Sequence, residues 1–170
     1  EESMKTKIHA SFLCALTALF AASAGWAADR TLSVDNSNGS YYINMPATGN
    51  DKLVISETDI VDGSLSFKVY DDGGSSDAYS NDARGFLEID VPEGYRLSVY
   101  GSMVVGYYEE DYLTIYDGTI YDEAVINRLG SNSWRTDYEI DPFVSSSESI
   151  IIYFKTDSDQ RHPGLLLTID

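Results

Sequence analysis

Carboxylates gather at two places in the second half of the sequence, and they are the residues best suited to carry chemistry. Three of them head the alternating segment EEDYLTIYDG, and two follow the apolar segment SIIIYF. Carboxylate oxygens are ligands that calcium prefers, and crowded carboxylates repel one another unless a cation lies between them. The pattern therefore indicates either a calcium site or a solvated acidic rim. The five residues are Glu109, Glu110, Asp111, Asp157 and Asp159.

Catalysis is poorly supported by the same residue types. The adjacent pairs Asp71-Asp72 and Glu109-Glu110 could in principle serve as acid and base in glycoside hydrolysis. Neither pair has a recognisable acid–base context, and exposed acidic pairs usually belong to the solvated surface. His162 is the only histidine after residue 27, so a histidine triad or a zinc cluster has almost no ligands. We therefore expect a protein that is not an enzyme.

The charge of the chain limits its partners. The 170 residues carry a formal net charge of −17 at pH 7. A field of that sign repels nucleic acid and anionic membrane surfaces, and it suits cations, neutral glycans or basic proteins. We therefore expect no nucleic-acid partner. The simpler interpretation is that the charge only keeps the protein soluble.

The first residues have the pattern of a secretory signal peptide. Two lysines precede an apolar run at 12–22, and small residues follow as far as Ala27. The run is shorter than the roughly 20 residues that a membrane span needs. We predict a signal peptide at 1–27, cleaved near Ala24 or Ala27, and no insertion into the membrane. The expected location is secreted, extracellular or at the cell surface.

Removal of this segment also removes Cys14, the only cysteine. The mature chain would then hold no disulfide, and packing or a metal ion must stabilise it. It keeps the full net charge, because two acidic and two basic residues precede Ala28. Cysteine-free secreted modules of this size are more typical of bacterial proteins than of animal ones.

Beyond residue 30 the apolar residues alternate with polar ones almost everywhere, which predicts short strands separated by Gly, Asp, Asn and Ser turns. No segment of that part has three turns of helical periodicity. The pattern predicts an all-β fold, an antiparallel β-sandwich, with an N-terminal β extension at 28–62 and the sandwich domain at 63–170. Expected strands are 41–45, 52–56, 65–70, 86–91, 96–105, 112–116, 149–154 and 165–169, and 124–129 is a strand or one helical turn.

The order of these segments resembles a CUB domain. The resemblance is carried by VYDDGGSSDAYSNDARGFLEIDVPEGYRLSVYG, then EEDYLTIYDG, then IIIYFKTDSDQRHPGLLLTID, and it covers about 65–170. Only 111–118 is close to diagnostic, and the four cysteines that are usual in eukaryotic members are absent. The chain is thus similar to the cysteine-free CUB-like modules of bacterial proteins. The resemblance implies a jelly-roll of two packed sheets and a binding role without catalysis.

The resemblance also implies a calcium site. Many CUB domains hold a calcium ion between two loops through carboxylates. Carried over position by position, the ligands fall on Asp111 and Asp157, and a helper ligand falls on Asp159. The tyrosine that orients an acidic ligand in the family falls on Tyr79. Calcium is accordingly the cofactor that the resemblance implies.

One ligand of the family has no counterpart at its expected place. The glutamate position falls on Met103, or on Tyr107 when the Pro-Glu-Gly turn is used for alignment. Either the site is lost, or Glu109 or Glu110 has replaced that ligand from a tighter loop. The alternative without metal is a solvated acidic rim at one end of the sandwich.

Aromatic residues near the acidic segment are candidates for contact with a partner. Trp134 and the tyrosines at 107, 108 and 112 could form a platform that stacks on sugars, although half of the tyrosines in an alternating strand face the core. We take Tyr79, Tyr107 and Tyr108 as the candidate partner-binding residues.

Three functions remain open from the sequence. The first is a secreted, non-enzymatic CUB-like module that binds an extracellular protein or glycan. The second is a carbohydrate-binding module of a polysaccharide-degrading system, which glycan binding lost on Trp134→Ala would favour. The third is a structural adhesin or spacer domain without a ligand of its own, whose folding a chelator would leave unchanged.

Overall fold

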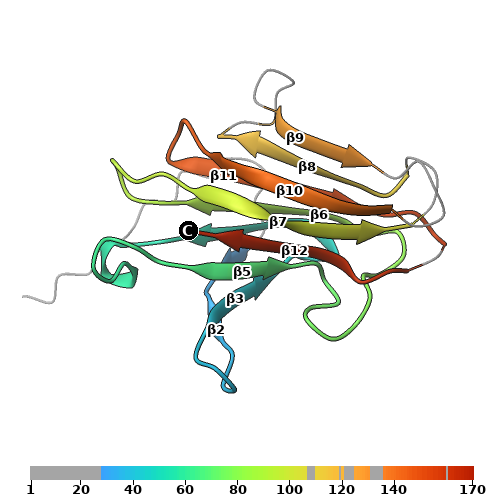
Figure 1. The fold of residues 1–170 in the computed structure, drawn as a ribbon, viewed down its shortest axis with the longest axis horizontal. Coiled ribbons are helices and arrows are strands. Elements are labelled where there is room, and N and C mark those ends of the chain that lie inside the picture. Colours follow the sequence, from blue (N-terminus) through green and yellow to red (C-terminus); the bar gives the residue numbers. More distant parts are fainter. Residues whose placement is uncertain (1–27, 107–109, 119, 121–124, 131–135, 160) are drawn as a thin grey trace, which may run out of the picture.

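The computed structural model describes residues 28–106, 110–118, 120, 125–130, 136–159 and 161–170. In these ranges the chain forms two six-stranded sheets that face each other (Figure 1). Sheet A contains, in spatial order, β1 (Ala28–Arg30), β4 (Thr48–Val54), β6 (Arg84–Asp90), β11 (Ser149–Lys155), β8 (Tyr112–Asp117) and β9 (Val125–Gly130). Sheet B contains β10 (Thr136–Val144), β7 (Ser98–Val105), β12 (Gly164–Ile169), β5 (Phe67–Tyr70), β3 (Tyr41–Asn44) and β2 (Ser33–Val34). The predicted all-β sandwich is confirmed.

The strands form because their alternation gives each sheet one apolar face. In β6, Leu87 and Ile89 are completely buried, whereas Phe86 and Glu88 on the opposite face are only half-buried. Side chains of this kind from both sheets meet in one core. Full burial of each large aliphatic side chain contributes roughly 1.5–3 kcal/mol, so this shared core is the main source of stability.

The N-terminal extension enters both sheets. β4 pairs with β6 in sheet A, β3 pairs with β5 in sheet B, and β1 pairs with β4 at the edge of sheet A. These three pairings are parallel, and the others between the described strands are antiparallel. The alternation of a strand gives its buried face but not the direction of its neighbour, so the sequence pattern did not predict the parallel pairs.

Two further differences from the prediction have local causes. β10 was not predicted, because it carries acidic residues and Pro142 and lies at the edge of sheet B, where only one side is paired. β4 begins at Thr48, although Gly49 and Asn50 indicated a turn. The ambiguous segment at 124–129 is strand β9.

Three loops meet at one end of the sandwich, because β5, β7 and β11 end there and their successors begin there. The described residues of these loops are 71–83, 106, 110–111, 156–159 and 161–163, and we call this region the acidic end. A single turn of 3-10 helix at Glu57–Asp59 is the one helical element in the described ranges. None of the described helices has the length and apolar character that crossing a membrane requires.

Candidate functional site

Asp111 is the central residue of the acidic end. Its side chain is completely buried directly before β8. Oδ2 accepts hydrogen bonds from the Tyr79 hydroxyl at 2.6 Å and from the Gly106 amide at 3.2 Å, and Oδ1 accepts one from the Asp157 amide at 2.8 Å. One carboxylate thus holds three loops together, since each donor comes from a different loop.

This burial corrects the expectation that Asp111 is part of a solvated rim. Burial is the main cause that raises the pKa of Asp111, and the nearby charge of Asp157 adds to it. The three hydrogen bonds oppose the shift, because they favour the ionised carboxylate. The group is therefore an interior carboxylate that depends on its donors.

Tyr79 is the strongest of these donors. Its side chain is completely buried and lies edge-on to the ring of Phe154, with centroids 5.4 Å apart. Burial, and then the hydrogen bond to Asp111, raise the pKa of Tyr79 well above its usual value, so the hydroxyl keeps its proton. Tyr79 does not reach the surface, and the expectation that it contacts a partner does not fit its position.

The loops at 79–83 and 156–162 are joined by a further set of hydrogen bonds. The Thr156 hydroxyl donates to the Ser80 carbonyl at 2.8 Å and accepts from the Ala83 amide at 2.9 Å. The Asn81 side chain donates to the Ser158 carbonyl at 2.7 Å. These bonds hold Asp157 beside Asp111.

Asp71 is a second buried carboxylate, and its place in the interior was not expected. It was considered only as half of an exposed acidic pair, but its side chain is completely buried. Its two oxygens accept from the amides of Gly73 and Leu165, both at 2.8 Å. Burial raises its pKa to about 6. The only sequence signal was the Asp-Asp-Gly-Gly turn that follows β5.

Gly164 connects the two buried carboxylates. It has a φ of +78°, and a Cβ at this position would overlap Oδ2 of Asp71 and lie 2.9 Å from the Tyr79 ring. Glycine is required here by the conformation and by the close approach. Asp71, Gly164, Tyr79 and Asp111 therefore form one contiguous unit.

The structure describes some of the remaining predicted site residues. Asp157 is half-buried, and its Oδ1 accepts from the amide of the exposed Asp159 at 2.8 Å. Glu110 is exposed and lies 3.8 Å from the Lys155 ammonium group. The structure thus brings Asp157 to Asp111, joins the amide of Asp159 to Asp157, and places Glu110 near a lysine. Glu109, Tyr107, Tyr108 and Trp134 lie outside the described residues.

The ligand atoms available at the acidic end are of the chemical type that calcium binds. The groups are oxygens, which calcium prefers, and Asp111 uses three of the roughly four acceptor positions of a carboxylate on its protein donors. Among the described residues no group of three or more His, Cys, Asp or Glu side chains lies close enough to hold a metal. Asp111 keeps about one acceptor position and Asp157 keeps Oδ2, so a calcium ion here would need most of its ligand oxygens from other groups.

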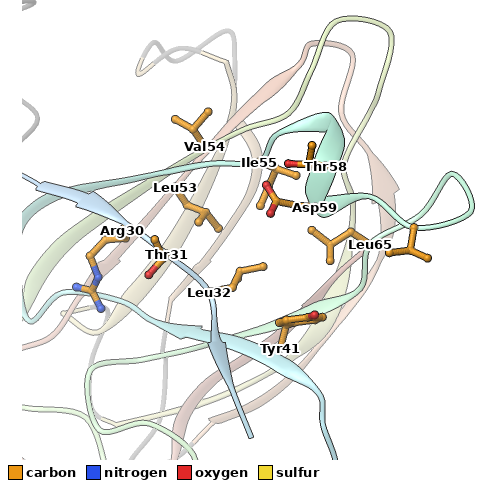
Figure 2. A pocket seen from close by; sticks show the side chains of 11 residues that line it. Arg30, Thr31, Leu32, Tyr41, Leu53, Val54, Ile55, Thr58, Asp59 and Leu65 are labelled. Atoms are coloured by element: carbon orange, nitrogen blue, oxygen red, sulfur yellow. The ribbon is translucent and has the colours of Figure 1, made fainter.

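A hollow of about 280 Å³ lies at another place, where the chain passes from β1 to β2. Figure 2 shows the side chains of Arg30, Thr31, Leu32, Leu53 and Leu65 around it. Its lining is mixed, with the apolar side chains of both sheets next to an ion pair of Arg30 with Asp51. It shares no residue with the acidic end.

No protein-family model matches the sequence, and no curated protein matches it. Solved structures do match. The CUB1-EGF-CUB2 domains of rat MASP-1 have a TM-score of 0.49 and 16% identity over 81% of this chain, and those of human MASP-1/3 have 0.48 and 14% over 81%. This chain spans 45% and 46% of those two chains, which is less than half of their length. A MASP-1 CUB2 domain bound to Ca²⁺ has a TM-score of 0.46 and 17% identity, over 61% of this chain and 90% of that one.

Proposed function

We propose that this chain is a non-enzymatic, extracellular binding module that recognises a basic group of a protein partner at its acidic end, and that calcium organises this end. The observation that carries the proposal is the buried carboxylate of Asp111, held by Tyr79, Gly106 and Asp157. A fixed group of this kind gives neighbouring loops one geometry before a partner arrives, which lowers the entropic cost of binding.

Calcium would be held by Asp111 and Asp157, with Asp159 and Glu109 or Glu110 as further ligands. When bound, it would neutralise carboxylates that otherwise repel one another. Support comes from the pKa of Asp111, which burial and the charge of Asp157 raise. A cation beside the two groups would favour their ionised forms.

Binding is favoured over catalysis by how the carboxylates are used. The two buried ones, Asp71 and Asp111, already accept hydrogen bonds from backbone amides on both oxygens. Such groups position loops and are poorly placed to transfer protons to a substrate. The exposed Asp77 belongs to the same end and is not one of the proposed calcium ligands, so a basic partner could reach it.

The test is thermal unfolding of the chain from residue 28 in excess calcium and in excess chelator. Calcium at a hundredfold excess over its Kd adds about 2.7 kcal/mol of stability, which is several degrees in Tm for a domain of this size. Asp157→Asn should remove the calcium-dependent part, and Asp77→Asn, an exposed residue of the same end, should keep it. Coincident wild-type curves would contradict the site.

The partner is tested with a surface that presents polylysine. Simple attraction to the charge of −17 would weaken when calcium neutralises part of it. A calcium-organised site predicts the opposite, namely tighter binding with calcium than with chelator, and loss of that gain in Asp157→Asn. Binding that is equal or weaker with calcium would exclude recognition of basic groups at this end.

A further inference from the structure

An open hollow of about 330 Å³ lies beneath the hairpin that joins β2 to β3. Figure 1 shows this hairpin projecting away from the two sheets. We call the hollow the hairpin pocket. The residues used below are Asp35, Ser37, Ser40, Tyr42, Tyr70 and Ser75, all of which line it. Its volume is at the lower end of the range of small-molecule sites, roughly 300–1,000 Å³.

Two tyrosines on neighbouring strands give the pocket an aromatic side. Tyr42 on β3 and Tyr70 on β5 are half-buried, and their rings meet edge to face with centroids 6.2 Å apart. This contact fixes both rings. A tyrosine offers an apolar ring surface together with a polar hydroxyl, which suits a ligand that is itself apolar on one face and polar at its edge.

The hairpin gives the pocket its polar side. Oδ1 of Asp35 accepts from the amide of Ser37 at 2.8 Å and from its hydroxyl at 2.6 Å. Within the described part of the chain, no hydrogen bond involves Oδ2 of Asp35 or the hydroxyls of Tyr42 and Tyr70. Acceptors and donors with spare capacity therefore surround the space.

The hairpin loop is rigid although it has no hydrophobic core. The Asp35 amide donates to the Ser40 carbonyl at 2.8 Å, and the Gly39 amide donates to the Asp35 carbonyl at 2.7 Å. The amide and the hydroxyl of Ser40 both donate to Oδ1 of Asn38, at 2.9 and 2.6 Å. A loop that is ordered in advance loses little freedom when a ligand binds.

We propose that the hairpin pocket binds one neutral sugar unit, either free or at the end of a glycan chain. The ring of a sugar has a face of C–H groups that packs on tyrosine, and its hydroxyls both donate to Asp35 and accept from Tyr42 and Tyr70. Among the described residues that line the pocket there is no lysine or arginine, and the chain has a net charge of −17, so an anionic ligand is disfavoured. The pocket shares Ser75 with the acidic end but none of the proposed calcium ligands, and it needs no calcium.

The test is calorimetric titration of the chain from residue 28 with glucose, galactose, mannose, xylose and N-acetylglucosamine, and with the tetramer of any sugar that binds. We expect one of them to bind with a Kd below about 10 mM, in chelator as well as in calcium. Glucuronate should bind more weakly than glucose, because its carboxylate meets Asp35. Equal affinity of monomer and tetramer indicates recognition of a terminal or free unit, and tighter binding of the tetramer indicates a chain. Absence of binding for the whole panel would overturn the proposal.

Variants then locate the binding. Tyr70→Ala should weaken it at least roughly tenfold, whereas Tyr70→Phe keeps the ring and should retain most of it. Tyr153→Ala is the matched control, since Tyr153 is a half-buried tyrosine on the outer face of the other sheet. Loss on Tyr153→Ala with retention on Tyr70→Ala would overturn the assignment. If a variant does not fold, amide hydrogen exchange of the wild-type chain, measured with and without the sugar, tests the location instead. The sugar must slow exchange of the amides at 35–40 and leave that of the amides at 79–83 unchanged.

Discussion

Two regions of this protein use an aspartate to order a loop, and they do so in opposite environments. At the acidic end, Asp71 and Asp111 are completely buried, and burial raises the pKa of both. On the β2–β3 hairpin, Asp35 lies at the surface, and its bonds with the hydroxyl and then the amide of Ser37 lower its pKa. The same side chain is thus a costly interior group in one region and a favourable surface acceptor in the other.

The comparison teaches that the donors have different roles in the two regions. At the acidic end they compensate a charge that has been removed from water, so the loss of either side leaves a buried group unpaired. On the hairpin, water replaces any partner that is lost. Damage at the acidic end should therefore spread to the whole fold, and damage on the hairpin should remain local.

The largest effect is expected for Asp111→Ala. The change leaves the Tyr79 hydroxyl and the amides of Gly106 and Asp157 without their buried acceptor. We expect a loss of about 3–5 kcal/mol in the free energy of unfolding, measured in urea at pH 7. Glu110→Ala, one residue away but exposed, should change it by less than about 0.5 kcal/mol. Equal and small effects for both variants would remove the distinction between the regions.

A smaller effect with a defined sign is expected for the pH dependence of Asp71. Its pKa rises from 3.8 to about 6 on folding, so the folded state prefers the protonated form. The protonated Asp71 carboxyl therefore contributes roughly 3 kcal/mol to the free energy of unfolding. This contribution is complete below about pH 4 and is lost as the pH rises through 6. The free energy of unfolding of wild type minus that of Asp71→Asn should fall by this amount between pH 4 and pH 7. A flat or rising difference would show that burial does not control this carboxyl.

The smallest effect is expected on the hairpin. Because the pKa of Asp35 is lowered, its hydrogen bonds hold the loop at neutral pH and are lost as the pH falls through the folded-state pKa, below 3.8. Asp35→Ala at pH 6 should reduce the hydrogen-exchange protection of the amides at 37–40 severalfold without moving the urea midpoint. A shift of the midpoint would mean that the hairpin supports the global fold.

Much of the fold follows from the alternation of apolar residues. β5, β6, β8, β11 and β12 were predicted within a few residues, because each buries every second side chain or contains three consecutive buried residues. β10 was missed, since an edge strand with acidic residues and a proline has only a weak pattern. The parallel pairing of the extension depends on how the chain passes between the sheets, which no local pattern encodes.

The site was predictable only in part, for a related reason. That Asp111 and Asp157 meet follows from their places before β8 and after β11, which pair antiparallel. Whether such a carboxylate is wet or buried depends on the loops that cover it, and these come from distant parts of the sequence. For this reason the sequence predicted that Asp111 lies near Asp157 but not that it is buried. The burial of Asp71 was not predicted either.

The parallel strands within residues 28–62 also limit edge-to-edge association between molecules. β3 covers the side of β5, and β4 covers the side of β6, so two sheet edges are closed by residues 28–62. The strands that remain outermost on that side, β1 and β2, have only three and two residues. Short edges give a second chain little backbone to pair with. A chain that begins at residue 63 would expose unpaired backbone groups of β5 in one sheet and of β6 in the other. Because these two exposed edges differ, pairing between molecules could continue from one to the next and form open-ended filaments rather than a closed dimer.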